Sequence, residues 1–242
     1  ALFEYARGPR SGRTNQIIRV DGNWTKIDPH LGQAVKDLGM SGVTTTIHDN
    51  YFMFIKINFM MVVSPSNRDA LADAEFELRR RQQASLELLQ KTIPGATNAF
   101  IARTASTITI RRARCIECDY DISLDAIVNG SHYPDEVFSY GFHDSAPRIQ
   151  IKGGKTYGLP YRTMLVKGLD NLFAIGMMIT SDHEAHMSTR NTVSCMAMGQ
   201  ASGTAAALCV KNGISEIREL PYQKLYDALK LGNVWFDAEI PY

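Results

Sequence analysis

The stretch from residue 192 to 211 constrains the fold of this chain more than any other, because it is long, apolar and made largely of small residues. Its end is marked by Gly213, which stands where the glycine after a helix is expected. Gly199, Gly203 and Ala207 fall on one face of the predicted helix, since residues four apart share a face. Side chains this small allow a strand or a planar ligand to approach the helix backbone; tight helix–sheet packing is the structural alternative.

The remaining sequence predicts an α/β fold in which strands and helices are mixed. Helical periodicity predicts helices over 27–38, 66–91 and 221–231. Branched and aromatic residues predict strands over 43–63, 100–120 and 171–176. Asp49-Asn50 is the predicted hairpin turn, and Ser66 the predicted N-cap of the second helix, with Asp69 three residues on. Turn-forming residues predict that 121–158 is rich in loops.

Composition excludes several classes of protein. With 26 Lys+Arg against 25 Asp+Glu the formal net charge is +1, and the longest basic run, 79–81, lies in a predicted helix. Nucleic-acid binders carry a basic excess, so we expect no nucleic-acid partner. The most apolar stretch, 193–210, is interrupted by polar residues, so no membrane span is expected. Four cysteines are too few for a disulfide framework, and with no signal peptide we expect a cytoplasmic location.

A strongly polar segment separates the short strand ending at Gly176 from the long helix. It carries Asp182, His183, Glu184, His186, Ser188, Thr189 and Arg190. Helix N-termini present unpaired N–H groups and a partial positive charge, so they stabilise anions and developing negative charge. A solvated surface loop is the alternative interpretation. We favour a functional one, because so many ionisable groups ahead of a helix N-terminus are not typical of a core.

Two further groups of residues could carry chemistry. In a strand, Arg112 and Arg114 would share one face and Arg111 would lie on the other. His183 and His186 are three apart and flanked by acids, one residue short of the HExxH zinc motif, and no third ligand is near, so no metal site is expected. Half a zinc site at the Cys-x-x-Cys of residues 115–118 has even less support, because residues three apart in a strand face opposite ways.

The C-terminal half of the sequence resembles a known family. The segments that carry the resemblance are 159–162, 167–176, 181–186, Arg190 and 195–207. In this order they are similar to the C-terminal part of FAD-dependent oxidoreductases, a family distantly similar to fumarate reductase flavoproteins. The likeness extends over about 44–213, and Arg111-Arg112-Ala113-Arg114 stands where the family has an Arg-Glu-Ser-Arg-like motif. It implies the C-terminal half of a two-domain, glutathione-reductase-like fold, with antiparallel substrate-domain strands in a mixed sheet and a long buried helix at the flavin.

The resemblance also implies site residues. The cofactor is FAD, and its contacts would come from the turn at Gly176 and Met177 and from the start of the long helix, Arg190, Asn191, Thr192 and Val193. Met177 and Met178 stand where many relatives have an acidic residue. The catalytic candidates on the substrate side of the flavin are His183, Glu184, His186, Arg111 and Arg114. For each arginine, an ordinary structural ion pair is the alternative to an anion clamp or a proton relay.

One element of the family is missing from the sequence. No Gly-x-Gly-x-x-Gly, which binds the ADP half of FAD, occurs among the 18 glycines. A second polypeptide could supply it, a longer precursor could have been cleaved, or the chain could be a relic that stands alone. We favour the first two together, which predicts a hetero-oligomeric split enzyme and an apolar surface where the missing domain docks.

These inferences predict three regions: an N-terminal arm over 1–40, a substrate-domain-like region over 41–158, and the C-terminal part of the FAD-binding domain over 159–242. The predicted activity is hydride transfer between a small organic substrate and flavin N5. Alcohol or sugar oxidation and C–C desaturation, or the reverse reduction, remain open, and the two histidines favour hydroxyl deprotonation slightly. The alternative is a non-catalytic structural subunit of a flavoprotein complex that has kept only the fold.

Overall fold

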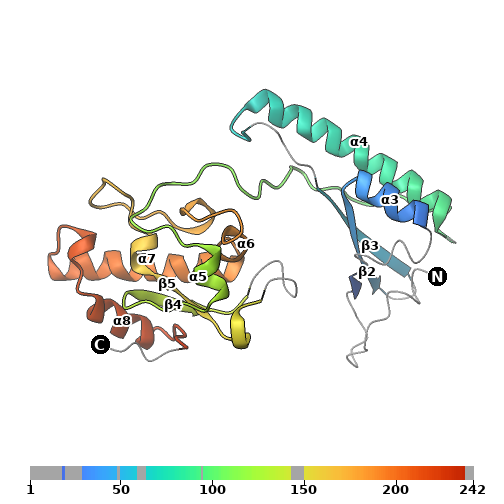
Figure 1. Cartoon of the computed structure of the whole chain (residues 1–242). Helices are drawn as coiled ribbons and strands as arrows, with labels where there is room; N and C mark the ends of the chain where they lie inside the picture. The colour runs from blue at the N-terminus through green and yellow to red at the C-terminus, as the bar shows by residue number, and fades with distance from the viewer. Residues whose placement is uncertain are drawn as a thin grey trace. The chain divides into compact units, whose positions relative to one another are not determined.

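The computed structural model of the chain describes residues 18–19, 29–47, 50–58, 64–93, 95–142 and 150–237 (Figure 1). The chain divides between Ile110 and Arg111 into two compact units, each with a core of its own. The predicted boundary at 158/159 falls inside strand β5 (Tyr157–Pro160), and residues on both sides of it share one core. Most of the predicted N-terminal arm lies outside the described residues.

The first unit contains an antiparallel sheet in the order β1 (Ile18–Arg19), β2 (Met40–Ile47) and β3 (Asn50–Ile57). The predicted hairpin is confirmed, because β2 and β3 pair along their whole length; Asp49 of its turn lies outside the described residues. Helix α3 (Pro29–Asp37) confirms the first predicted helix. After it, Gly39 has φ +64° and a Cβ there would lie 2.3 Å from the Asn58 carbonyl oxygen, so only glycine fits this turn.

Helix α4 (Arg68–Thr92) confirms the second predicted helix. The N-cap prediction was wrong by one residue: Asn67 Oδ1 accepts hydrogen bonds from the backbone N–H groups of Asp69 and Ala70, both at 3.1 Å. Asn67 is the residue directly before the helix, and the Ser66 hydroxyl lies 2.8 Å from Ser64 Oγ. Both helices pack on the sheet around a small core formed by Leu31, Val35, Met40 and Leu89.

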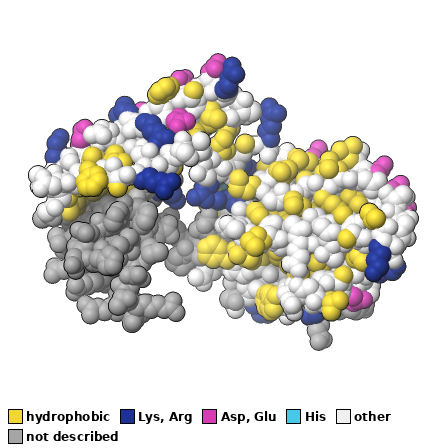
Figure 2. All heavy atoms as spheres, turned by 180° about the vertical axis from the view of Figure 1, so that it is seen from behind, with side chains coloured by type: hydrophobic (Ala, Val, Ile, Leu, Met, Phe, Trp, Pro, Cys, Tyr) yellow, Lys and Arg dark blue, Asp and Glu magenta, His cyan; other side chains and the backbone are white. Residues whose placement is uncertain are grey.

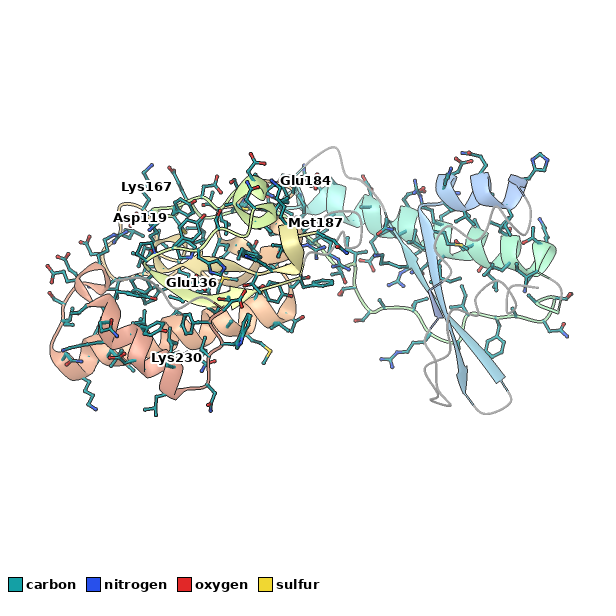
Figure 3. The ribbon with its side chains drawn as sticks, turned by 60° about the horizontal axis from the view of Figure 1, so that its bottom comes forward. Asp119, Glu136, Lys167, Glu184, Met187 and Lys230 are labelled. Carbon is teal, nitrogen blue, oxygen red and sulfur yellow. The ribbon has the colours of Figure 1, made fainter. Side chains whose placement is uncertain are left out.

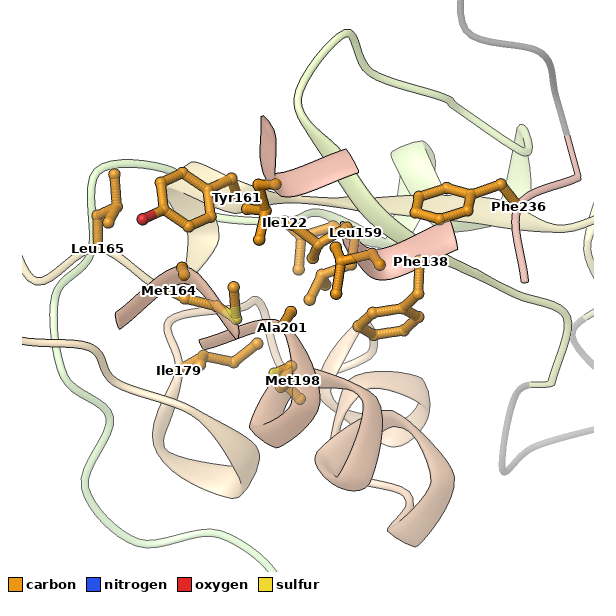
Figure 4. Packing of buried hydrophobic residues seen from close by; sticks show 14 of the residues in the cluster. Ile122, Phe138, Leu159, Tyr161, Met164, Leu165, Ile179, Met198, Ala201 and Phe236 are labelled. Atoms are coloured by element: carbon orange, nitrogen blue, oxygen red, sulfur yellow. The ribbon is translucent and has the colours of Figure 1, made fainter. Parts of the chain in front are cut away.

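The second unit is built around a two-stranded antiparallel sheet and a long helix. Strands β4 (Glu136–Tyr140) and β5 form the sheet, helix α7 (Thr192–Asn212) packs against β4, and α8 (Tyr222–Leu231) packs against α7. The shorter helices are α5 (Leu124–Val128), α6 (His186–Thr189), η1 (Lys152–Gly154), η2 (Tyr161–Thr163), η3 (Gly176–Met178) and η4 (Ile217–Glu219). Figure 4 shows the core between them, where Met198 and Ala201 of α7 meet side chains such as Phe138 and Leu159.

Three predictions about strands and sheets were wrong. Residues 100–120 and 171–176 are not strands: they pair only through isolated bridges, of which Ile116–Ile179 is parallel and Leu165–Phe173 antiparallel. Leu165 and Phe173 form a single bridge, beside which the Val166 N–H donates to the Leu172 carbonyl oxygen at 3.3 Å and the Ala174 N–H to the Met164 carbonyl oxygen at 2.9 Å. The stretch 121–158 is rich in loops, as predicted, and it also contains α5, β4 and part of β5. The two described sheets are entirely antiparallel, so within them the predicted mixed sheet is not seen.

The long helix is as predicted in extent, from Thr192 to Asn212, and it ends at Gly213 with φ +65°. Its burial differs from the prediction. One face is buried, comprising Ser194, Met198, Ala201, Ser202, Ala205 and Cys209. Among the described residues the small face is open: none of their atoms lies within 4 Å of a Cβ at Gly203, and only Ile175 Cδ1, at 4.0 Å, approaches one at Gly199. By length and composition α7 could cross a membrane, a test that core helices also pass; its buried face belongs to the core of this unit.

Candidate functional site

The polar segment ahead of α7 is organised around Asp182. One carboxylate oxygen accepts the Ala185 N–H and the other accepts the Leu124 N–H at the start of α5, both at 2.6 Å. Its carbonyl oxygen accepts the His186 N–H at 3.0 Å, which begins α6. Asp182 therefore caps the turn into α6 and ties that turn to α5, although the residue itself is exposed.

Arg112 holds the same segment from the other side. Its guanidinium donates to the carbonyl oxygens of Ser181, at 2.8 Å, and Asp182, at 3.0 Å. The catalytic candidates predicted from the sequence were Arg111 and Arg114, and both of these residues are exposed. Strand alternation could not single out Arg112, because it placed Arg112 with Arg114 and because 111–114 is not a regular strand.

His186 is the buried member of the predicted catalytic set, with 2 % of its surface exposed. Its Nε2 lies 3.0 Å from the Arg111 carbonyl oxygen, which can only accept, so Nε2 carries the proton and Nδ1 is left as an acceptor. Burial, and then the positive charges of Arg112 and Arg190 and the neighbouring His183, lower the pKa of His186 and keep it neutral. His183 and Glu184 are exposed.

Helix α6 is fastened to the core beneath it. The Tyr157 hydroxyl lies 2.8 Å from Ser188 Oγ, and Ser188 in turn donates to the Phe142 carbonyl oxygen at 2.5 Å. Because that carbonyl takes the Ser188 proton, Tyr157 is the donor to Ser188, and burial raises the pKa of Tyr157 so that it keeps its proton. Figure 3 shows Glu184 and Met187 at the same end of this unit, where a 3.1 Å backbone hydrogen bond joins them.

The predicted cofactor residues lie at the start of α7 and in η3. Asn191 is the N-cap, but its side chain donates back to the Met187 carbonyl oxygen at 3.2 Å and forms no cap hydrogen bond to α7. Thr192 and Val193 are exposed, whereas Arg190 is buried and its Nη2 lies 3.7 Å from Met187 Sδ. The first amide N–H groups of α7 are thus not capped by the Asn191 side chain.

Gly176 and Met177 form the turn on the other side of the site. Gly176 has φ +74°, and a Cβ on it would lie 3.8 Å from Cys195 Sγ on α7. Met177 and Met178 are nearly half exposed. The structure therefore brings η3 beside the first turns of α7, as the prediction for Gly176 and Met177 requires, while the roles of these residues stay predictions.

No three His, Cys, Asp or Glu residues within the described ranges are grouped as a metal site. Cys118 is buried, and burial raises the pKa of its thiol, which disfavours the thiolate that metals require.

Comparison with known proteins identifies a family. A model of the FAD dependent oxidoreductase family matches residues 12–229. No curated protein and no solved structure matches the chain. The cofactor implied by the family is FAD.

The residues around the α7 N-terminus fit the flavin end of FAD. Buried side-chain atoms without a hydrogen-bond partner, as far as the described residues show, include His186 Nδ1, Thr189 Oγ1 and Ser181 Oγ. A buried polar atom of this kind is costly unless it meets a partner, and a flavin ring edge carries both N–H donors and carbonyl acceptors. The ADP half has no Gly-x-Gly-x-x-Gly to receive it in these 242 residues.

Proposed function

The chain belongs to the FAD dependent oxidoreductase family, and on that premise we propose that it is the substrate-side part of an enzyme that transfers hydride between a small organic substrate and flavin N5. A bound flavin supplies the two-electron chemistry. The observation that carries the proposal is the segment 181–190, fixed by Arg112 and Asp182 directly ahead of an α7 N-terminus that Asn191 does not cap.

The start of α7 would hold the flavin and tune it. Reduced flavin carries negative charge on its pyrimidine ring, and the N-terminal amides of a helix stabilise such charge. Arg190, buried immediately before the helix, adds a full positive charge. Thr192 and Val193, both exposed, would contact the ring. Among the described residues, the face of α7 at Gly203 is open.

The segment 181–186 would handle the proton. In the oxidation of an alcohol, the C–H hydrogen leaves as hydride to the flavin and the O–H proton leaves to a base. His183 and Glu184 are exposed and able to exchange that proton with water. Arg111 and Arg114, also exposed, suit an anionic substrate or the developing alkoxide. Sugar oxidation and C–C desaturation require the same arrangement of hydride acceptor and base.

The ADP half of FAD would be held by a second polypeptide that carries the Gly-x-Gly-x-x-Gly domain, and a cleaved precursor would give the same assembly. An apolar surface of the second unit supports this proposal, and hydrophobic side chains are spread over the face seen in Figure 2. Exposed apolar residues on η3, on the first turns of α7 and in the turn before η3 are Leu169, Leu172, Met177, Met178, Val193 and Met196. Surfaces of this kind are typical of protein interfaces.

Paired variants test the proposed site and the proposed partner separately. Replacing Arg190 with Met should weaken flavin retention by the purified complex while the partner stays bound, whereas Lys211→Met, at the far end of α7, should leave both unchanged. Replacing Gly203 with Leu fills open space in the isolated chain and should weaken partner binding. Ala72→Leu, at an exposed position of α4, is the control. Undiminished flavin content in Arg190→Met would contradict the site. A stable complex without flavin in the native protein would favour the structural-subunit alternative.

A further inference from the structure

Arg111 and Arg112, at the start of the second unit, hold the loop 181–186 through three hydrogen bonds. Arg112 donates to the carbonyl oxygens of Ser181 and Asp182. The Arg111 carbonyl oxygen accepts the Nε2 proton of His186 at 3.0 Å. The three hydrogen bonds join segments about 70 residues apart in sequence, so the position of the His186 ring depends on where Arg112 holds the loop.

The geometry limits what His186 can do. Because Nε2 is committed to a carbonyl oxygen, the neutral ring exists as the Nε2–H tautomer and presents Nδ1 as a bare acceptor. Nδ1 is buried and has no hydrogen-bond partner within the part of the chain that is described. A second proton on Nδ1 would place a cation among positively charged neighbours: Arg112 from the segment before it, Arg190 at the end of α6, and the titratable His183 in the same loop.

We propose that Arg112 is a positioning residue that fixes His186 as a neutral Nε2–H tautomer, so that His186 Nδ1 accepts a hydrogen bond from an N–H or O–H donor of the bound flavin or substrate. Arg112 touches neither; it acts through the loop that carries His186. His186 in this state cannot donate through Nδ1, so it selects a donor group on the ligand and rejects a bare carbonyl oxygen. This inference rests on the proposed function for the identity of the ligand, but the tautomer itself does not.

Asp182 holds the same loop together with Arg112. It accepts the N–H groups of Leu124 and Ala185, and its own carbonyl oxygen accepts both Arg112 and the His186 backbone. A guanidinium suits this position better than an ammonium, because its planar fork reaches two successive carbonyl oxygens at once. Lysine at position 112 keeps the charge near His186 but can hold the loop at only one of the two points with good geometry.

The test is nitrogen NMR of histidine side chains in the full 242-residue chain, in the assembly in which it is isolated. The native protein should show His186 as the Nε2–H tautomer, with a pKa below the ordinary histidine value. In Arg112→Met the His186 signal should become a mixture of tautomers and the pKa of His186 should rise, because the positive charge and the loop anchor are both lost. In Arg112→Lys the pKa of His186 should stay low, and the preference of His186 for the Nε2–H tautomer should be weaker than in the native protein. Arg103→Met removes an exposed arginine of the first unit and should change neither.

Two outcomes overturn the inference: an Nδ1–H tautomer for His186 in the native protein, or an unchanged tautomer and titration in a folded Arg112→Met. If Arg112→Met does not fold, Arg112→Lys decides alone, and an unchanged tautomer preference in it overturns the inference. In flavin-loaded protein, Arg112→Lys should also shift the flavin absorption maxima. If Arg112→Lys changes the tautomer preference as expected but leaves the flavin absorption maxima where they are in the native protein, the result would contradict the proposed function and not the positioning role.

Discussion

Replacing Gly158 with alanine should destabilise the second unit strongly, because the space beside Gly158 is filled by a buried carboxylate. A Cβ at this position would lie 2.0 Å from Glu136 Oε2 and 2.3 Å from Glu136 Cδ. Glu136 is 1 % exposed and cannot swing into water. Its carboxylate accepts hydrogen bonds from His132 Nδ1, at 2.7 Å, and from Ser139 Oγ.

The cost follows from these contacts. To admit the methyl group the Glu136 carboxylate must move by more than 1 Å, and both of its hydrogen bonds then break. A hydrogen bond to a charged group contributes about 1.5 kcal/mol or more, so the loss of two amounts to roughly 3 kcal/mol. Ser139 Oγ also accepts the Asp237 N–H at 2.8 Å, so the displacement reaches the C-terminal segment. For a chain of this size, roughly 3 kcal/mol lowers Tm by about 6 to 12 °C.

Thermal unfolding followed by near-ultraviolet circular dichroism measures this change, because the tyrosine-rich core lies in the second unit. Glu136→Ala supplies the control, because it removes the carboxylate with which the methyl group of Gly158→Ala would clash. In that background Gly158→Ala should cost much less, and the difference between the two backgrounds is the coupling energy. A Tm for Gly158→Ala within about 2 °C of the native value would refute the reasoning, as would equal effects in the two backgrounds.

Three further predictions follow from the structure. Gly203→Ala should stabilise the isolated chain by about 0.5–1 kcal/mol in urea unfolding, because alanine favours a helix and nothing lies near its Cβ; a loss of stability would show that the face is occupied. Asn67→Ala should cost about 1 kcal/mol and Ser66→Ala only a few tenths, since Asn67 caps α4; the reverse order would restore the sequence prediction. Because the pKa of His186 is lowered in the folded protein, the unfolded chain takes up the proton first, so stability should fall as the pH drops below the ordinary histidine range. His186→Gln should flatten this decline, and an unchanged slope would contradict it.

The helices were predictable because their signals are local. Gly39 and Gly213 end α3 and α7 as expected, and the periodicity of 68–92 needs no tertiary partner. Strands β4 and β5 were missed because their pairing depends on a chain reversal across 141–156, with turn residues that predict loop equally well. The predicted strand at 171–176 failed for the opposite reason: its residues suit a strand, but the only bridge it forms in the described chain is Leu165–Phe173.

The sequence located the candidate site but not its internal order. It identified the polar segment before α7, because ionisable residues ahead of a helix N-terminus are a local pattern. It could not distinguish buried His186 from exposed His183, since that depends on contact with Arg111, about 70 residues earlier. Arg112 was passed over for the same reason. The prediction of a long buried helix holds for one face of α7, whereas among the described residues no atom lies within 4 Å of a Cβ at Gly203.

An absorption spectrum of the protein purified without tags from its source, recorded with intact mass spectrometry on the same sample, tests the central claim most directly. Our account predicts flavin bands together with a second polypeptide whose sequence contains Gly-x-Gly-x-x-Gly. It also predicts that Arg190→Met loses the bands while both polypeptides remain together. A colourless, monodisperse single chain would contradict the account and leave only the likeness of fold.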